Sequence, residues 1–255
     1  MHWKPYDFTK KSGMKINRAE NLSQLEVANI YDDLFKGEGR LRDSDSFYNW
    51  VLDRLHPDPG CKLLDVACGE GLLIKAARER GVNAIGIDLS AQAAKLSVRR
   101  LGVQVVAVAN GEKLPFQAHS FDYVTNIGSL EHFFNPSTGI QEMKRIMKPG
   151  GRAAYVLPNS YYLVDLIWQV WRTGYGPSHK QPMEMFATFR EWWELLEKHG
   201  MQVNKAYKYN FCFPRTRGDY RWYRQHPKKI LNLLLSPIIP FNFSNHFLYI
   251  CSHMP

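Results

Sequence analysis

The chain alternates short apolar runs with stretches whose apolar residues recur at helical spacing. Runs typical of buried strands lie at residues 62–67, 83–88, 103–109, 121–126 and 152–157. Between them, amphipathic stretches predict helices at residues 71–80, 90–101 and 137–147. Strands and helices that alternate through short turns predict an α/β fold built on a doubly wound parallel sheet.

Two further helices are predicted before the first of these strands. Residues 19–36 have a helical pattern, and Asp43 or Ser44 is placed to cap a second helix that ends at Leu55. Because both helices precede the core, we expect them to lie across the mouth of a site at the edge of the sheet.

A glycine turn connects the first predicted strand to the helix that follows it. Gly69 and Gly71 let the backbone turn sharply and approach a ligand closely. The start of the helix directs unpaired N–H groups and a positive dipole end at the same crevice. Asp88 ends the second strand 19 residues after Gly69, where its carboxylate can accept hydrogen bonds from ribose hydroxyls. This order predicts a pocket for a nucleoside-bearing cofactor.

The residues around the turn separate two classes of nucleotide site. A dinucleotide fingerprint would have Gly or Ala where this chain has Ile74. The segment Asp-Val-Ala-Cys-Gly-Glu-Gly at residues 65–71 instead resembles the first motif of class I S-adenosylmethionine-dependent methyltransferases, type 11 group. Later segments resemble this family's other motifs in the same order, at residues 88–90, 109–116, 121–124, 130–132 and 147–151. The chain is most similar to the ubiquinone and menaquinone biosynthesis methyltransferases within that group.

The resemblance implies a Rossmann-like sheet of seven strands, mostly parallel with an antiparallel last strand, and helical cap insertions. It implies S-adenosyl-L-methionine as the cofactor and S-adenosyl-L-homocysteine as the product. By the same resemblance, Asp65 orients the first loop and the cofactor amine, and Asp88 holds the ribose. Asn110 with Gly111 meets the adenine. The implied cofactor-binding residues are Asp65, Ala67, Cys68, Gly69, Gly71, Asp88, Leu89, Asn110, Gly111, Glu112 and Asn126.

Two residues depart from the family pattern. The family usually has Gly at the position of Ala67, and an alanine fits there without strain if its φ is negative. The family usually has Asp where this chain has Asn110, whose amide oxygen can accept the same hydrogen bond without a charge. We therefore expect the cofactor site to be intact.

His132 is the candidate general base, since imidazole can take a proton near neutral pH. The alternative is that Glu131 and His132 form a structural pair at a helix start. Some ubiquinone-pathway O-methyltransferases that resemble this segment hold a metal with an acidic residue three positions before the Glu. That position is Gly128 in this chain, so we expect no metal site.

The length of the chain predicts a single domain with insertions over residues 1–255. The late apolar runs at residues 201–209 and 246–251 are candidates for the sixth and seventh strands, after a helix that contains Trp192, Trp193, Leu195 and Leu196. We expect cap helices, a cofactor-binding core, a substrate lid and the rest of the sheet at residues 1–58, 59–157, 158–187 and 188–255. A basic and apolar insertion occupies residues 211–245 of the last part.

The predicted lid is rich in aromatic residues and follows the fifth strand at its carboxyl end, where open sheets bind ligands. The candidate substrate contacts are Tyr31, Tyr161, Tyr162, Trp168 and His179. The alternative for each aromatic residue is ordinary packing of a helix onto the sheet.

Positive charge is concentrated outside the core of this chain, whose formal net charge is +9. Residues 201–230 hold eight basic residues and one acid, Asp219. The apolar run 230–241 that follows is too short and too rich in proline to span a bilayer. It fits a membrane-interface segment, the wall of an apolar pocket, or an ordinary buried helix beside solvated charges.

Composition limits the remaining classes of localisation and function. The 255 residues include four scattered cysteines without metal or disulfide spacing, and Met1–Pro5 contain no apolar signal-peptide core. We therefore expect a cytoplasmic protein, peripheral to the membrane if residues 211–245 contact it. The predicted activity is methyl transfer to a small-molecule acceptor, anionic or lipid-linked, with O-methylation favoured over C- or N-methylation. An RNA methyltransferase and a non-catalytic S-adenosylmethionine-binding protein are the alternatives, although no nucleic-acid module is evident.

Overall fold

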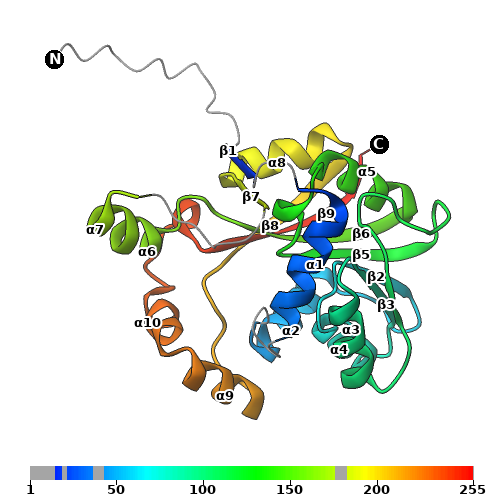
Figure 1. Cartoon of the computed structure of the whole chain (residues 1–255), viewed down its shortest axis with the longest axis horizontal. Coiled ribbons are helices and arrows are strands. Elements are labelled where there is room, and N and C mark those ends of the chain that lie inside the picture. The colour runs from blue at the N-terminus through cyan, green and yellow to red at the C-terminus, as the bar shows by residue number, and fades with distance from the viewer. Residues whose placement is uncertain (1–14, 19–21, 37–42, 176–182, 255) are drawn as a thin grey trace.

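A seven-stranded sheet forms the centre of the molecule in the computed structural model, which describes residues 15–18, 22–36, 43–175 and 183–254 (Figure 1). The strand order is β4-β3-β2-β5-β6-β9-β8. The strands are β2 (Lys62–Val66), β3 (Asn83–Asp88), β4 (Val106–Val108), β5 (Phe121–Ile127), β6 (Met147–Pro158), β8 (Met201–Tyr209) and β9 (His246–His253). β9 is antiparallel to both of its neighbours, and the pairs from β4 to β6 are parallel. The predicted α/β fold, with its antiparallel last strand, is confirmed.

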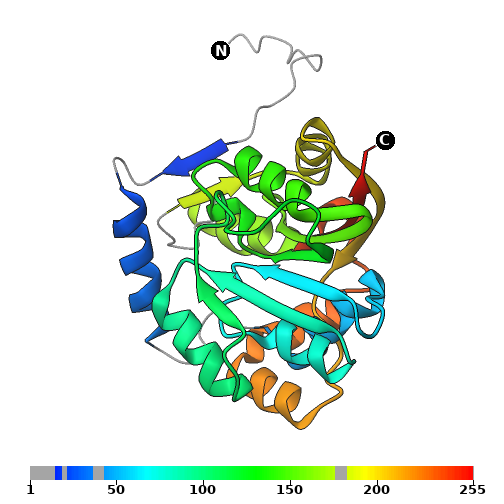
Figure 2. The same ribbon diagram turned by 90° about the vertical axis from the view of Figure 1, so that its right-hand side faces the viewer.

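Helices cover both faces of this sheet (Figure 2). The helices α2 (Asp45–Leu55), α3 (Leu72–Glu79) and α4 (Ala91–Leu101) pack on one face. The other face is covered by α5 (Pro136–Ile146) and α8 (Phe189–Lys198), whose Trp192 is fully buried. Burial of strand residues on both faces explains why their sequences read as continuous apolar runs.

Two core strands differ in length from the sequence prediction. β4 begins only at Val106, because Val103 is 40% exposed and Val105 donates its N–H back to the Val103 carbonyl at 3.1 Å, in a turn. β6 begins already at Met147, which pairs with Phe121 before the register shifts and Arg152 pairs with Tyr123.

Helix α1 (Gln24–Phe35) begins with a capping box in which Ser23 and Glu26 each accept a hydrogen bond from the other's backbone N–H. α2 has Ser44 at its N-cap, but the serine makes no capping bond with its side chain. The α1 residue Asp32 accepts hydrogen bonds from the Ser90 hydroxyl and the Gln92 N–H at the start of α4. These bonds fix α1 beside the end of β3.

A second, two-stranded sheet was not predicted from the sequence. β1 (Lys15–Arg18) pairs antiparallel with β7 (Met183–Phe186). β7 packs against the 3-10 turn η1 (Leu130–His132), which follows β5. The N-terminal segment and the end of the predicted lid therefore meet beside the candidate base.

The two insertions contain short helices. The predicted lid forms α6 (Leu163–Asp165), the π-helical turn η2 (Leu166–Val170) and α7 (Trp171–Thr173). The later insertion forms α9 (Arg217–Gln225), α10 (Pro227–Leu235) and the turn η3 (Phe241–Phe243). Across the described part of the chain, no helix combines the length and the apolar character needed to cross a membrane.

The interpretation of residues 230–241 as an ordinary buried helix is wrong. α10 does bury Leu233, but Leu231 is 59% exposed and Leu234 is 64% exposed. The helix therefore has a second apolar face that the protein does not cover.

Candidate functional site

A cavity of about 210 Å³ opens at the carboxyl ends of β2, β3 and β5. This is the sheet edge where open α/β folds bind their ligands. Helix α1 supplies one wall of the cavity and η1 supplies another. The predicted residues that line it are Tyr31, Asp65, Ala67, Cys68, Gly69, Asp88, Leu89, Asn110, Gly111, Glu112 and His132.

The loop after β2 uses left-handed backbone at three of its residues, Ala67, Gly69 and Gly71. Gly69 has φ of 51°, and a Cβ there would lie 3.5 Å from the Phe35 ring across the cavity. Ala67 has φ of 59°, so the condition under which this alanine would fit without strain, a negative φ, is not met. An L-residue with a side chain pays a strain energy in this conformation, which glycine avoids.

Asp88 is positioned by backbone donors on both of its oxygens. Its Oδ2 accepts the Gly69 N–H at 2.8 Å, and its Oδ1 accepts the Ser90 N–H at 2.8 Å. The carboxylate is 7% exposed, and burial raises its pKa to about 6 despite these donors. Each oxygen keeps a second lone pair, so the group can still accept from a diol at the cavity.

Asp65 is the second carboxylate of the cavity. Its Oδ1 accepts the Thr125 hydroxyl at 2.7 Å, from the neighbouring strand. Burial raises the pKa of Asp65 to about 7. The hydrogen bond from Thr125 lowers this pKa, and the charge of Asp88 raises it by a smaller amount. A cation placed beside Asp65 would favour its ionised form.

The segment after β4 is shaped by its own side chains. The Asn110 Oδ1 accepts the Glu112 N–H at 2.8 Å, and the Glu112 Oε1 accepts the Phe134 N–H at 2.6 Å. Gly111 lies under the Phe133 ring, where an added Cβ would come within 2.5 Å of the ring. A larger residue at this glycine would therefore displace an aromatic wall of the cavity.

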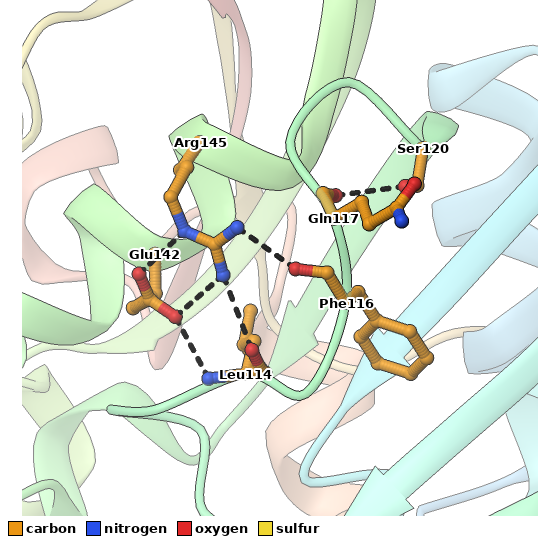
Figure 3. Close-up of polar contacts among 6 residues, drawn as sticks. All are labelled: Leu114, Phe116, Gln117, Ser120, Glu142 and Arg145. Carbon is orange, nitrogen blue, oxygen red and sulfur yellow. Dashed lines mark hydrogen bonds and ion pairs between the residues drawn. The ribbon is translucent and has the colours of Figure 1, made fainter.

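The same segment is attached to α5 through hydrogen bonds to an ion pair of that helix (Figure 3). Arg145 and Glu142 form a paired contact, with the Arg145 Nε at 2.7 Å from the Glu142 Oε1. The guanidinium also donates to the carbonyls of Leu114 and Phe116, at 3.1 and 2.8 Å. Glu142 accepts the Leu114 N–H at 2.8 Å. The backbone after Glu112 is thus held at several points.

Glu131 and His132 lie together on η1. The His132 Nε2 is 3.6 Å from the Glu131 Oε1, and both side chains are largely buried. The Tyr31 ring, from α1, lies 6.3 Å from the His132 ring between centroids. This arrangement places an imidazole with a neighbouring carboxylate at the wall of the cavity.

Four predicted residues whose side chains or backbone are fully described do not line this cavity, namely Gly71, Asn126, Tyr161 and Tyr162. Gly71 begins α3 and faces Ser97 of α4, whose hydroxyl would lie 2.1 Å from an added Cβ. Asn126 is fully buried, and its Nδ2 donates to the Val66 carbonyl at 3.2 Å. Tyr162 is buried, whereas Tyr161 is 47% exposed. The Trp168 backbone lies in η2 and its side chain is not described, while His179 lies outside the described residues.

Other lining residues were missed from the sequence. They come from the cap helices, the loops after β2 and β4, the start of α3, and the end of β5 with the segments that flank η1. They are Gln24, Val27, Phe35, Tyr48, Glu70, Leu72, Ala109, Ile127, Gly128, Ser129, Phe133 and Phe134. The amphipathic pattern of residues 19–36 was the available signal for the α1 residues, because it marks one face for contact. Tyr48 had no comparable signal.

No group of three or more His, Cys, Asp or Glu side chains suited to a metal occurs among the described residues. Glu70, which lines the cavity, forms an ion pair with Arg100 of α4 instead. The chemistry of the lining is therefore that of four carboxylates (Asp65, Glu70, Asp88 and Glu112), one imidazole and aromatic walls.

Comparison with known proteins identifies this chemistry. Residues 64–155 match the family model described as "Methyltransferase domain". This match spans β2 to β6, the strands that build the cavity. These residues form a methyltransferase domain, and the chain is an S-adenosylmethionine-dependent methyltransferase. Its cofactor is S-adenosyl-L-methionine.

The methyltransferase has a curated relative in Acinetobacter baylyi, a ubiquinone biosynthesis O-methyltransferase. The two are 29% identical over 191 residues, which are 68% of this chain and 79% of the relative. A solved structure of Haemonchus contortus phosphoethanolamine N-methyltransferase 2 has a TM-score of 0.60 at 16% identity. The alignment covers 91% of this chain and 58% of that one.

A further solved structure shows the limit of fold likeness. The [4+2]-cyclase SpnF superposes with a TM-score of 0.64 at 18% identity, over 95% of this methyltransferase and 99% of the cyclase. At such identities the structures establish the shared fold alone, because one fold carries many reactions.

The residues of the cavity suit this cofactor. Two buried carboxylates match a cationic amine and a ribose diol, and the Phe35 and Phe133 rings give apolar surface for a planar base. The left-handed backbone at Gly69 keeps one side of the cavity clear of a side chain.

Proposed function

We propose that this methyltransferase acts on a hydroxyl oxygen of a small-molecule acceptor. The Glu131–His132 pair at the cavity carries the proposal, since a hydroxyl nucleophile must lose its proton as it is methylated. The similarity to a protein named as an O-methyltransferase of ubiquinone biosynthesis favours the same atom.

The bound cofactor supplies a methyl group already activated by the sulfonium, so the transfer is an in-line displacement. The protein then has to align the acceptor and keep water out. In our assignment, Asp88 accepts from the ribose hydroxyls and Asp65 pairs with the cofactor amine. Asn110 and Gly111 border the adenine.

His132 is assigned the role of base, and its imidazole takes the acceptor's hydroxyl proton. Glu131 would stabilise the resulting imidazolium through the 3.6 Å contact between Oε1 and Nε2. Tyr31, from α1, borders the same part of the cavity and is assigned to contact the acceptor.

The acceptor is proposed to be anionic or lipid-linked. Eight basic residues stand against one acid within residues 201–230, which favours attraction of a negatively charged partner. For a lipid-linked acceptor, residues 211–245 would contact the membrane that carries it.

The test uses methyl-labelled S-adenosylmethionine with panels of hydroxyl, amine and carbon acceptors, followed by mass spectrometry to locate the label. We expect oxygen methylation, and we expect His132→Gln to lower kcat by about 10²–10⁴-fold, the usual contribution of a general base. The dissociation constant of S-adenosylhomocysteine should stay unchanged in that variant. Label on nitrogen or carbon, or an unaltered kcat in His132→Gln, would contradict the proposal.

A further inference from the structure

Exposed apolar side chains gather in the two insertions of this protein. Of the 16 large hydrophobic residues exposed in the described part of the chain, 12 belong to residues 161–175 and 213–243. The most exposed are Trp171 at 85%, Tyr175 at 78% and Ile238 at 76%. Single exposed apolar residues are normal, but a gathering of this size marks a contact surface.

The two insertions lie side by side, although they are distant in sequence. The Asn159 Nδ2 donates to the carbonyls of Asn242 and Ser244, each at 2.8 Å, so the ends of the insertions are bonded together. α6, α7 and α10 occupy the same side of the molecule, and α9 packs beside α10 (Figure 1). We call this side the insertion face.

The described charges exposed along the insertion face are positive. Arg172 on α7 and four arginines around α9 are exposed, the latter being Arg215, Arg217, Arg221 and Arg224. Of the two acids, Asp219 is fully buried and Asp165 is half-buried. The face thus combines bare apolar side chains with guanidinium groups and has no exposed carboxylate among its described residues.

Helix α9, which carries most of these arginines, is bonded to helix α2 of the protein core. Asp219 accepts the Ser46 N–H at 2.9 Å and the Ser46 hydroxyl at 2.6 Å, which joins α9 to α2. Its Oδ2 also accepts the N–H groups of Arg215 and Thr216, each at 2.8 Å. Two residues after Ser46, Tyr48 of α2 lines the cofactor cavity. The insertion face therefore has a short structural connection to the active site.

We propose that the insertion face docks on a bilayer surface that contains anionic phospholipids. Short amphipathic helices lie in a membrane interface, where apolar side chains enter the acyl boundary and arginines meet the headgroups. A wholly apolar partner would leave the arginines without counter-charges. A nucleic acid would leave the exposed aliphatic side chains of α10 in contact with water. This inference deepens the proposed function by naming where a lipid-linked acceptor would be met.

The experiment is co-sedimentation of the full chain with vesicles of phosphatidylcholine, alone or mixed with phosphatidylglycerol. Wild type should bind the anionic vesicles at least about tenfold more tightly, and added salt should weaken the binding. Arg221→Gln with Arg224→Gln should lower the affinity roughly 30-fold, since each basic residue near the surface contributes about 1 kcal/mol. Trp171→Ser with Leu234→Ser should weaken binding to both kinds of vesicle.

Arg99→Gln and Val108→Ser are the matched controls. Arg99 on α4 and Val108 on the edge strand β4 are exposed outside the insertion face, so both variants should leave binding unchanged. All variants should keep wild-type affinity for S-adenosylhomocysteine, which confirms folding and separates this test from that of methyl transfer. The proposal is overturned by equal binding to both vesicle types or by no binding. It is also overturned if the control variants lose as much vesicle affinity as the variants of the insertion face. It is also overturned if the face instead binds RNA or a second copy of the chain and not vesicles.

Discussion

At the residue scale, the cavity depends on a few side chains that sequence motifs could locate. Asp88 was predicted because it ends an apolar strand at the position where a ligand-binding carboxylate occurs in βαβ units, and Asp65 because residues 65–71 resemble a family motif. The φ of Ala67 could not be read from the sequence, because the turn geometry depends on the bonds between Asp88, Gly69 and Ser90. Asn126 was misplaced because the face on which a side chain lies near a strand end depends on strand register.

Ala67→Gly should stabilise the protein by about 0.5–1 kcal/mol, because glycine relieves the cost of a φ of 59°. Urea denaturation of the two proteins measures this difference. As the control, Ala76→Gly inside α3 should lower the free energy of unfolding by about 1 kcal/mol or more. A destabilised Ala67→Gly variant would show that the backbone strain is absent.

Asp65 should make cofactor binding depend on pH. Its folded pKa of about 7 lies above the unfolded value, so its ionisation lowers the free energy of unfolding as pH rises from about 4 to 7. A cationic amine paired with the ionised carboxylate reverses this cost. The affinity for S-adenosylhomocysteine should therefore rise about tenfold between pH 6 and 8. Asp65→Asn should bind more weakly, and its affinity should change only about twofold over this range, through Asp88. Calorimetry that shows the same pH profile for both proteins would exclude the pairing.

At the element scale, the strands and the helices between them were predictable because apolar periodicity determines them locally. The pairing of β1 with β7 was not, because it joins Lys15–Arg18 to Met183–Phe186 through backbone hydrogen bonds that leave no pattern in either segment. The use of α1 as a cavity wall was expected from its position, but its attachment through Asp32 to Ser90 depends on tertiary structure.

Asp32→Ala should loosen α1 from the start of α4, because the Ser90 hydroxyl and the Gln92 N–H lose their shared acceptor. With the wall less firmly held, S-adenosylhomocysteine should dissociate several-fold faster in stopped-flow displacement. Asp33→Ala is the control, since Asp33 lies on the same helix, exposed and paired with Lys36. Equal dissociation rates in both variants would argue against α1 as the element that retains the cofactor.

At the scale of the whole molecule, a cofactor-binding core carries two insertions with a different surface. The family model matches residues 64–155 alone, and the insertions lie beyond it. Composition located their positive charge, but only the structure brings residues 161–175 and 213–243 together on one side. Acceptor choice is expected to reside there, since variable segments around a constant core commonly set specificity.

The central claim, that this cavity binds the adenosyl cofactor through Asp88, is tested most directly by calorimetric titration of S-adenosylhomocysteine into wild type and Asp88→Asn. We predict that wild type binds with one site and that the variant loses at least about 30-fold in affinity, equal to about 2 kcal/mol for a charged hydrogen-bond acceptor. Its circular dichroism spectrum should stay unchanged. An unaltered dissociation constant in a folded Asp88→Asn protein, or no binding by wild type, would contradict the claim.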